Sequence, residues 1–258
     1  MTLAVLAVLS QVVYPLVSGP ARDVTTIITV VLFSAASLSH AWVHRGWRTA
    51  LAVAGVFAGG GLLIEVIGVA TGLPFGDYAY GDRIGPTVGD VPMIIPMAWT
   101  MLGYPALVVA RLITAHRWLG ISVGAGALAA WDLYLDPQMV AEGHWRWFSD
   151  GPHLIGSVPV TNYLAWLGTS WLMMTALWPR ASAWATAAHD DRVPVALYVW
   201  TWAGSLVAHV LLFDLPQSGL YGGLAMGLVV GLLAWRLRQP PAAAPTVPEV
   251  ISSAGGMP

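Results

Sequence analysis

The chain has 258 residues, of which 57% are hydrophobic and 9% are charged, and its formal net charge is −2. Soluble domains carry roughly 25% charged residues, so the composition excludes an ordinary soluble domain and indicates an integral membrane protein. A net charge this close to zero gives no basic surface for nucleic acid, and the absence of cysteine excludes disulfides, thiol catalysis and thiolate metal sites.

A transmembrane helix needs about 20 mostly apolar residues, and the chain contains eight candidate runs. In chain order they are Leu3–Val17, Val24–Trp42, Thr49–Ala70, Pro92–Leu112, Trp118–Met139, Val160–Trp178, Val193–Phe213 and Gly219–Trp235. The first run is the shortest, and because no basic segment precedes it we expect a membrane span rather than a cleaved signal peptide. The predicted fold is therefore all-α, a polytopic integral membrane helical bundle of seven to eight transmembrane helices.

The domain organisation follows from the same pattern. Residues 1–238 are expected to form one transmembrane helical domain. Residues 239–258 are rich in Pro, Ala and Ser, so they are expected to form a disordered C-terminal tail.

The arginines predict the orientation of the bundle. With eight spans both termini lie on one side, and only Arg22, Arg83 and Arg146 face the other. The arginines on the side of the termini are Arg45, Arg48, Arg111, Arg117, Arg180, Arg192, Arg236 and Arg238. Because basic residues concentrate in cytoplasmic loops, we expect a multi-pass protein of the cell membrane with both termini in the cytoplasm.

Ionisable side chains inside a membrane are expensive and usually functional. Glu65 stands alone in an apolar run, at about 1.5 Å per residue roughly 24 Å from the inner end of its span. Asp132 and His209 fall in the outer half of their own spans. The predicted spans and their orientation thus place a polar centre near the outer end of the bundle. The structural alternative for Glu65 is a hydrogen bond to a neighbouring helix.

Asp132 and Asp136 are four residues apart, so they share one helix face. Two carboxyl groups that face one cavity repel each other, and one of them is expected to hold its proton at neutral pH. Such an acid can protonate an alkene. The alternative is structural, with Asp132 bonded to another helix and Asp136 closing the helix before Pro137. The DLYLD motif is similar to the metal-binding motifs of membrane prenyltransferases, but those sites also need a second acidic motif and several basic groups for diphosphate. Only Arg83 and Arg146 lie nearby on the same side, so no metal site is expected.

Two loops between spans carry further candidates. In the loop 72–91, Phe75, Tyr78 and Tyr80 could cover an apolar pocket or anchor the chain at the membrane interface. In the same loop, Arg83 is expected to neutralise Asp82. In the loop 136–159, aromatic faces could stabilise a cation, with an interfacial belt as the alternative. The aromatic residues of that second loop are Trp145 and Trp147.

Three blocks of sequence resemble one enzyme family. TGLPFGDYAYGDRIGPTVGDVPMIIPMAW, WDLYLDPQMVAEGHWRW and GSVPVTNYLAWLG are similar to the carotenoid 1,2-hydratases, which include gamma-carotene 1′-hydroxylase-like and bisanhydrobacterioruberin hydratase-like membrane proteins. The resemblance covers about residues 65–168 and implies hydration of the terminal isopropylidene group of an acyclic carotenoid, without a redox cofactor. The residues it carries over are Glu65, Asp77, Tyr78, Tyr80, Asp82, Arg83, Trp131, Asp132, Asp136, Gln138, Glu142, Trp145, Trp147, Pro159 and Asn162.

The residues and the resemblance lead to one hypothesis, a cofactor-independent carotenoid hydratase that is a hydro-lyase. Asp132 is the expected general acid, and Glu65 or Asp136 is expected to orient or deprotonate the attacking water. The expected substrate-binding residues are Phe75, Asp77, Tyr78, Tyr80, Trp131, Trp145, Trp147, Asn162 and His209. The expected partners are an acyclic carotenoid, water and the lipid bilayer, with other carotenoid biosynthesis enzymes as candidates.

Two alternatives stay open at this point. An acid-initiated carotenoid cyclase would use the same first step but leave the mass of the substrate unchanged. A non-enzymatic carotenoid-binding or lipid-binding membrane protein, or a transporter, would leave the substrate unmodified.

Overall fold

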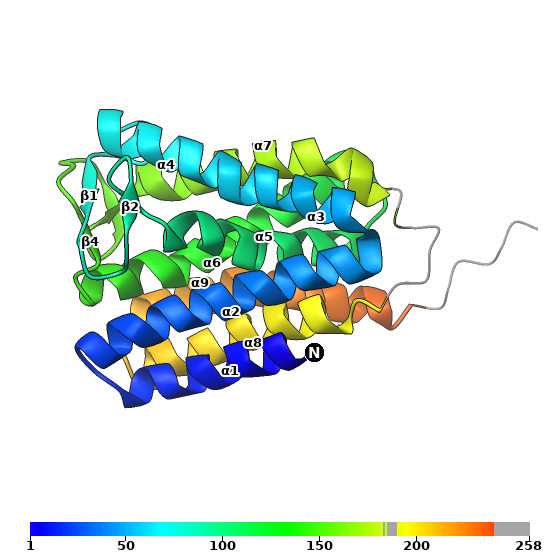
Figure 1. Ribbon diagram of the computed structural model, residues 1–258, viewed down its shortest axis with the longest axis horizontal. Helices are drawn as coiled ribbons and strands as arrows, with labels where there is room; N and C mark the ends of the chain where they lie inside the picture. Colours follow the sequence, from blue (N-terminus) through cyan, green and yellow to red (C-terminus); the bar gives the residue numbers. More distant parts are fainter. Residues whose placement is uncertain (183, 185–189, 240–258) are drawn as a thin grey trace, which may run out of the picture.

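The computed structural model describes residues 1–182, 184 and 190–239, and helices account for most of that chain. Each of the eight predicted spans falls on a helix, and the helices run side by side along the long axis of the molecule (Figure 1). The helices are α1 (Thr2–Val13) with the 3₁₀ turn η1 (Tyr14–Leu16), α2 (Pro20–Arg45), a continuous rod made of α3 (Trp47–Val53), the π-helix η2 (Ala54–Gly59) and α4 (Gly60–Thr71), α5 (Ile94–Ile113), α6 (Arg117–Ala141), α7 (Val160–Ser182), α8 (Arg192–Leu211) and α9 (Pro216–Leu237). The predicted all-α bundle is confirmed. The predicted tail lies outside the described residues from residue 240 onward.

Length and composition identify most of these helices as membrane spans. Among the described residues, six helices are long and apolar enough to cross a membrane: α2, the rod from α3 to α4, α5, α6, α8 and α9. The segment of α1 and η1 is shorter. Helix α7 is as long as several of these helices but is not among the six. The chain is therefore a multi-pass membrane protein, whereas the side on which each terminus lies stays a prediction.

Helix α5 forms the centre of the bundle. It lies between α4 and α7 on one side and α2 and α8 on the other (Figure 1). In its apolar stretch 89% of the residues are buried, against 28% for α8 and α9. Close approach of the neighbouring rod depends on Gly103, because a Cβ there would lie 2.6 Å from the Phe57 ring. The residues that face this helix are thus held in fixed positions.

Two prolines inside helices are compensated by serines from neighbouring helices. A proline lacks the N–H that would bond the carbonyl four residues earlier. Pro105 in α5 leaves the carbonyl of Met101 without that donor, and Ser37 donates to it at 2.9 Å. Pro137 in α6 likewise frees the carbonyl of Leu133, which accepts a 2.6 Å hydrogen bond from Ser218 on α9. The second pair lies directly beside Asp136, so it fixes the end of α6 that carries the predicted acids.

The connections from α4 to α5 and from α6 to α7 meet at one end of the bundle (Figure 1). The first holds β1 (Tyr78–Tyr80), β2 (Thr87–Val88) and β3 (Val91–Pro92), and the second holds β4 (Trp145–Trp147), β5 (His153–Ile155) and β6 (Val158–Pro159). Strand β1 pairs antiparallel with β4, with Tyr78 opposite Trp147 and Tyr80 opposite Trp145. The two loops therefore form one unit that covers the ends of α4 and α6.

Candidate active site

A cavity of about 580 Å³ lies inside the bundle beneath these joined loops. Its size is within the range of roughly 300–1,000 Å³ that is typical of small-molecule sites. Most of its wall is apolar or aromatic and comes from α1, α2, α5, α6 and α8. Among the described residues, Glu65 and Asp136 are the acidic side chains in the wall. A large apolar cavity with few polar groups suits a long apolar ligand that is held at one end.

Glu65 is buried, with 3% of its surface exposed, and its carboxyl group accepts three hydrogen bonds. The hydroxyls of Tyr78 and Tyr80 donate to Oε2 at 2.6 and 2.8 Å, and the indole N–H of Trp99 donates to Oε1 at 3.1 Å. Tyr78 and Tyr80 reach the same oxygen because alternate residues of a strand point to one face. All three groups are donors, so the carboxyl group of Glu65 acts only as an acceptor in these hydrogen bonds.

The hydroxyls of Tyr78 and Tyr80 stay protonated and act as hydrogen-bond donors. Burial raises the pKa of Tyr78 above that of an ordinary phenol, and the neighbouring Glu65 carboxylate raises it further. The same two causes, burial first, raise the pKa of Tyr80. Both hydroxyls therefore keep their protons across the physiological pH range and continue to donate to Glu65.

Asp132 and Asp136 form a joined pair on α6. The side-chain amide of Asn162, from the first turn of α7, donates to Oδ2 of Asp132 at 2.9 Å and also to Oδ2 of Asp136. Trp145 donates its indole N–H to the other oxygen of Asp136 at 3.1 Å. Oδ1 of Asp132 is buried and has no hydrogen-bond partner among the described residues. Asp136 is part of the cavity wall, whereas Asp132 lies behind it.

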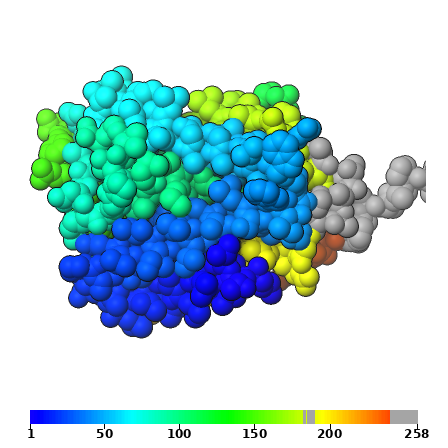
Figure 2. Space-filling model, viewed as in Figure 1, coloured from blue at the N-terminus to red at the C-terminus, as the bar shows by residue number. Residues whose placement is uncertain are grey.

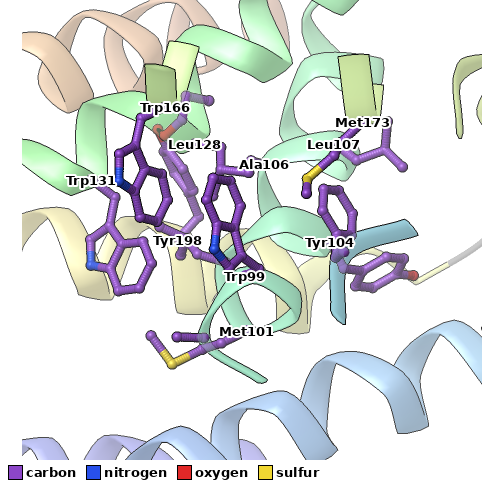
Figure 3. Packing of buried hydrophobic residues seen from close by; sticks show 14 of the residues in the cluster. Trp99, Met101, Tyr104, Ala106, Leu107, Leu128, Trp131, Trp166, Met173 and Tyr198 are labelled. Atoms are coloured by element: carbon purple, nitrogen blue, oxygen red, sulfur yellow. Dashed lines mark hydrogen bonds between the residues drawn. The ribbon is translucent and has the colours of Figure 1, made fainter. Parts of the chain in front are cut away.

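Three tryptophans form the aromatic part of the wall next to Glu65 and Asn162. Trp99 stacks on Trp166 with ring centroids 3.8 Å apart and planes 10° apart, and Trp131 meets Trp166 edge-on at 6.1 Å. Figure 3 shows these three rings close together within the buried core. Gly61 makes room for them, since a Cβ there would lie 2.7 Å from the Trp99 ring. This part of the cavity wall is therefore made of three tryptophan rings that pack on one another.

The aromatic residues of the joined loops also lie at the cavity. Phe75, Tyr78, Tyr80, Trp145 and Trp147 are all in its wall. The ring of Tyr78 stacks on Trp147 with centroids 5.8 Å apart, and the ring of Tyr80 meets Trp145 edge-on at 5.5 Å. These residues were predicted either to cover an apolar pocket or to anchor the chain at the interface. Their position in the wall fits the first of the two predictions.

Of two further predicted substrate-binding residues, one lies outside the cavity wall and the other lies within it. Asp77 is exposed and lies outside the cavity wall. Its backbone N–H donates a 2.7 Å hydrogen bond to Oγ of Ser149. His209 is buried in the α8 wall, with ring nitrogens 2.8 Å from the carbonyl of Ser205 and 3.1 Å from that of Tyr134. The ring of His209 is therefore held by backbone carbonyls instead of by the carboxyl groups.

A charged cluster ties the second loop to the start of α2. Arg22 pairs with Glu142, while Arg83 lies 3.5 Å from Asp23. Arg83 was expected to neutralise Asp82, but its ion pair in the described structure is with Asp23. His144 is buried 3.6 Å from the same aspartate. Burial lowers the pKa of His144, and the positive charge of Arg83 lowers it further. This cluster links the two loops to the start of α2, and none of its residues lies in the cavity wall.

The sequence interpretation missed Trp99, Trp166 and the residues of α1 and η1 that complete the wall. Trp166 could have been found, because it lies four residues after Asn162 and so on the same helix face. Trp99 lies near the start of α5, and nothing in the sequence indicated that its indole N–H reaches the carboxyl group of Glu65. Among the described residues, no group of three or more His, Cys, Asp or Glu side chains is arranged to hold a metal ion.

The fold is that of a multi-pass membrane protein with a mostly apolar cavity whose wall contains the carboxyl groups of Glu65 and Asp136. A family model described as "Carotenoid biosynthesis protein" matches residues 25–234, and the chain belongs to that family. It is 37% identical over 109 residues to a bisanhydrobacterioruberin hydratase of Haloarcula japonica, an alignment that covers 40% of this chain. The chain spans about a third (36%) of the length of that curated relative. No solved structure is significantly similar to this chain.

Proposed function

We propose that the protein adds water to the terminal isopropylidene double bond of an acyclic carotenoid and so forms a tertiary alcohol. The observation that carries this proposal is the apolar cavity whose wall contains the carboxyl groups of Glu65 and Asp136 beside three tryptophan rings. Membership of the carotenoid biosynthesis family and the name of the haloarchaeal relative support both the substrate and the reaction. The protein would then be a hydro-lyase that works in the direction of hydration.

The first step is transfer of a proton from the aspartate pair to the alkene. Two carboxylates bridged by one amide nitrogen repel each other when both are ionised, so the pair retains one proton. The O–H bond breaks, the proton adds to the CH carbon of the double bond, and a tertiary cation forms on the carbon that carries the two methyl groups. Asp136 delivers the proton because it touches the cavity, while Asp132 behind it balances the charge.

This assignment refines the one drawn from the sequence, in which Asp132 was the general acid. Depth in the bundle favoured Asp132, but contact with the substrate space favours Asp136. Both residues are needed in either version. With Asp132 absent, Asp136 would lose the neighbour whose negative charge keeps the proton on the pair.

The second step is capture of the cation by water. Oxygen of water bonds to the cationic carbon, and a proton leaves that oxygen for a carboxylate. Glu65 suits this role because three fixed donors stabilise its charged form in the cavity wall. The site is restored when this one proton passes from Glu65, directly or through water, back to the aspartate pair. No electrons are gained or lost in the sequence.

Aromatic faces protect the cation until water arrives. A positive charge over an aromatic face is stabilised by about 0.5–2 kcal/mol, more when water is excluded. Trp99, Trp131 and Trp166 supply such faces, and Tyr80 and Trp145 supply edges and faces from the loops. The same walls limit the number of water molecules that reach the cation, which favours a single addition.

The test is coexpression in a host that makes an acyclic carotenoid, with products read by chromatography and mass spectrometry. A new pigment heavier by one water for each modified end is expected. Asp136→Asn and Asp132→Asn should each lower product formation by roughly 10²–10⁴-fold, the usual contribution of a general acid. Asp90→Asn is the matched control, since Asp90 is an exposed loop carboxylate outside the cavity wall.

Each contrary result has a defined meaning. A product of unchanged mass with a shifted absorption spectrum would replace hydration by cyclisation. Unmodified carotenoid that copurifies with the protein would indicate a binding protein. Wild-type product yields from Asp136→Asn would remove the aspartate pair from the mechanism.

A further inference from the structure

The cavity reaches the lipid-facing surface on one side. Four residues of its wall are more than a third exposed: Val12 at 45%, Leu16 at 78%, Val207 at 53% and Leu212 at 58%. All four belong to the segment of α1 and η1 or to α8 and the residue after it. Every other described residue of the wall is buried or partly buried. The wall that separates the cavity from lipid is therefore a single layer at the contact between α1 and α8.

This contact is held by few interactions. The indole N–H of Trp200 on α8 donates to Oε1 of Gln11 on α1 at 2.7 Å, and both residues line the cavity. Tyr14 in η1 meets Phe213 edge-on at 5.7 Å. Helix α1 packs mainly along α2 and makes less contact with α8. In the space-filling view α1 lies beside α2 at the edge of the molecule (Figure 2).

The other side of α1 is attached more firmly. Ser10 of α1 accepts a 2.9 Å hydrogen bond from Thr29 of α2, and both side chains are buried. An opening at the α8 side would therefore leave the contact of α1 with α2 intact. The chain also has small residues where the opening would lie, because Ala203 and Gly204 of α8 line the cavity next to Trp200.

The length of the proposed substrate requires an exit for most of it. An acyclic carotenoid is about as long as the hydrocarbon core of a bilayer is thick, ~30 Å. A cavity of about 580 Å³ holds one end of such a molecule. The remainder must leave the protein through a part of the wall that faces lipid, and that part is the contact between α1 and α8.

We infer that the contact between α1 and α8 is a lateral portal, through which one end of a linear polyene enters from the bilayer while the rest stays in lipid. The hydrogen bond between Gln11 and Trp200 fastens this portal. The inference rests on the proposed function for the identity of the polyene. It predicts that the protein modifies one end at a time and that closing the portal blocks loading of the site.

The test uses the absence of native cysteine. Gln11→Cys and Trp200→Cys are combined, and the two thiols are bridged by a cleavable bifunctional reagent in protein reconstituted into lipid nanodiscs. Lycopene uptake is read as quenching of tryptophan fluorescence by the polyene, and hydration is read by mass. The bridged protein should lose both uptake and turnover, and cleavage of the bridge should restore both in the same sample. Single-cysteine variants treated identically control for the reagent.

A second pair of variants tests the portal without chemistry. Gly204→Phe places a ring beside Trp200, since a Cβ at Gly204 makes ordinary contacts of 3.5 Å with that indole and so fits on the backbone. Gly231→Phe on α9 is the matched control, because its Cβ would meet nothing within 4 Å and the residue is exposed outside the cavity wall. Uptake should be lost in Gly204→Phe and kept in Gly231→Phe.

The outcomes separate the portal from the reaction. Uptake by the bridged protein equal to that after cleavage, together with normal uptake by Gly204→Phe, would overturn the portal. Uptake that the bridge blocks and its cleavage restores, with no hydrated product, would support the portal and overturn the proposed hydration. Failure of the unbridged protein to take up lycopene or a longer acyclic carotenoid would overturn both.

Discussion

The charge of Glu65 can be measured through its tyrosine donors. Tyr78→Phe removes the 2.6 Å hydrogen bond to Oε2 and leaves the ring in place. Tyr80 still donates to the same oxygen, and Trp99 donates to the other. The substitution therefore removes one donor of three without exposing Glu65. The proposed role of Glu65 as a base requires that it be ionised in the resting protein.

The size of the effect distinguishes the two charge states. Hydrogen bonds to charged groups contribute about 1.5–3 kcal/mol, whereas neutral side-chain hydrogen bonds inside membrane proteins average about 0.6 kcal/mol. If Glu65 is a carboxylate, Tyr78→Phe should lower the free energy of unfolding by about 1.5–3 kcal/mol. The double variant with Tyr80→Phe should lose more than the sum of the two single changes, because Oε2 then keeps neither tyrosine donor.

The assay is reversible unfolding in mixed detergent micelles, with turnover measured on the same preparations. Tyr221→Phe serves as the control, since Tyr221 is 42% exposed and its hydroxyl has no hydrogen-bond partner among the described residues. A loss of about 0.6 kcal/mol or less in Tyr78→Phe, with additive behaviour in the double variant, would mean that Glu65 is protonated. That result would refute its role as the base.

Three other outcomes follow from the structure. Burial lowers the pKa of His144, so below its ordinary pKa the unfolded chain binds a proton that the folded chain does not. The free energy of unfolding should therefore fall as pH drops through about 6.5. In denaturation curves, His144→Gln should flatten this dependence. Gly61→Leu should destabilise the protein by about 1–3 kcal/mol and lower turnover, because its Cβ alone would lie 2.7 Å from the Trp99 ring; normal stability and turnover would contradict this packing. Ser218→Ala should lower the free energy of unfolding by about 1 kcal/mol, because it leaves the buried carbonyl of Leu133 unpaired. The loss should be smaller in a Pro137→Ala background, where residue 137 regains a backbone N–H for that carbonyl. Equal losses in both backgrounds would contradict the compensation of Pro137 by Ser218.

The sequence was sufficient to predict the helical bundle. Apolar length and spacing located eight spans, and each of them falls on a helix. The relation of the two loops also followed from span parity, which placed them on one side of the bundle. Their pairing through β1 and β4 did not follow, because two three-residue strands at a separation of more than sixty residues leave no pattern in the sequence.

The candidate site was predictable by residue type and less so by geometry. Burial of Glu65, Asp132 and Asp136 was expected, because an acid within a membrane span is costly and almost always faces the interior of the bundle. The aspartate that meets the cavity could not be predicted, because residues four apart share one helix face and the sequence does not distinguish them. Asp77 looked equivalent to its neighbours Tyr78 and Tyr80, but strand alternation turns only the tyrosines together toward Glu65.

The most direct test of the account is the origin of the oxygen in the product. The purified protein would be incubated in lipid nanodiscs with an acyclic carotenoid in water enriched in heavy oxygen, with and without air and reductant. If hydration is correct, each modified end gains one labelled oxygen without air or reductant, and Asp136→Asn forms no such product. Oxygen that comes from air, or a product without added oxygen, would contradict the hydration mechanism.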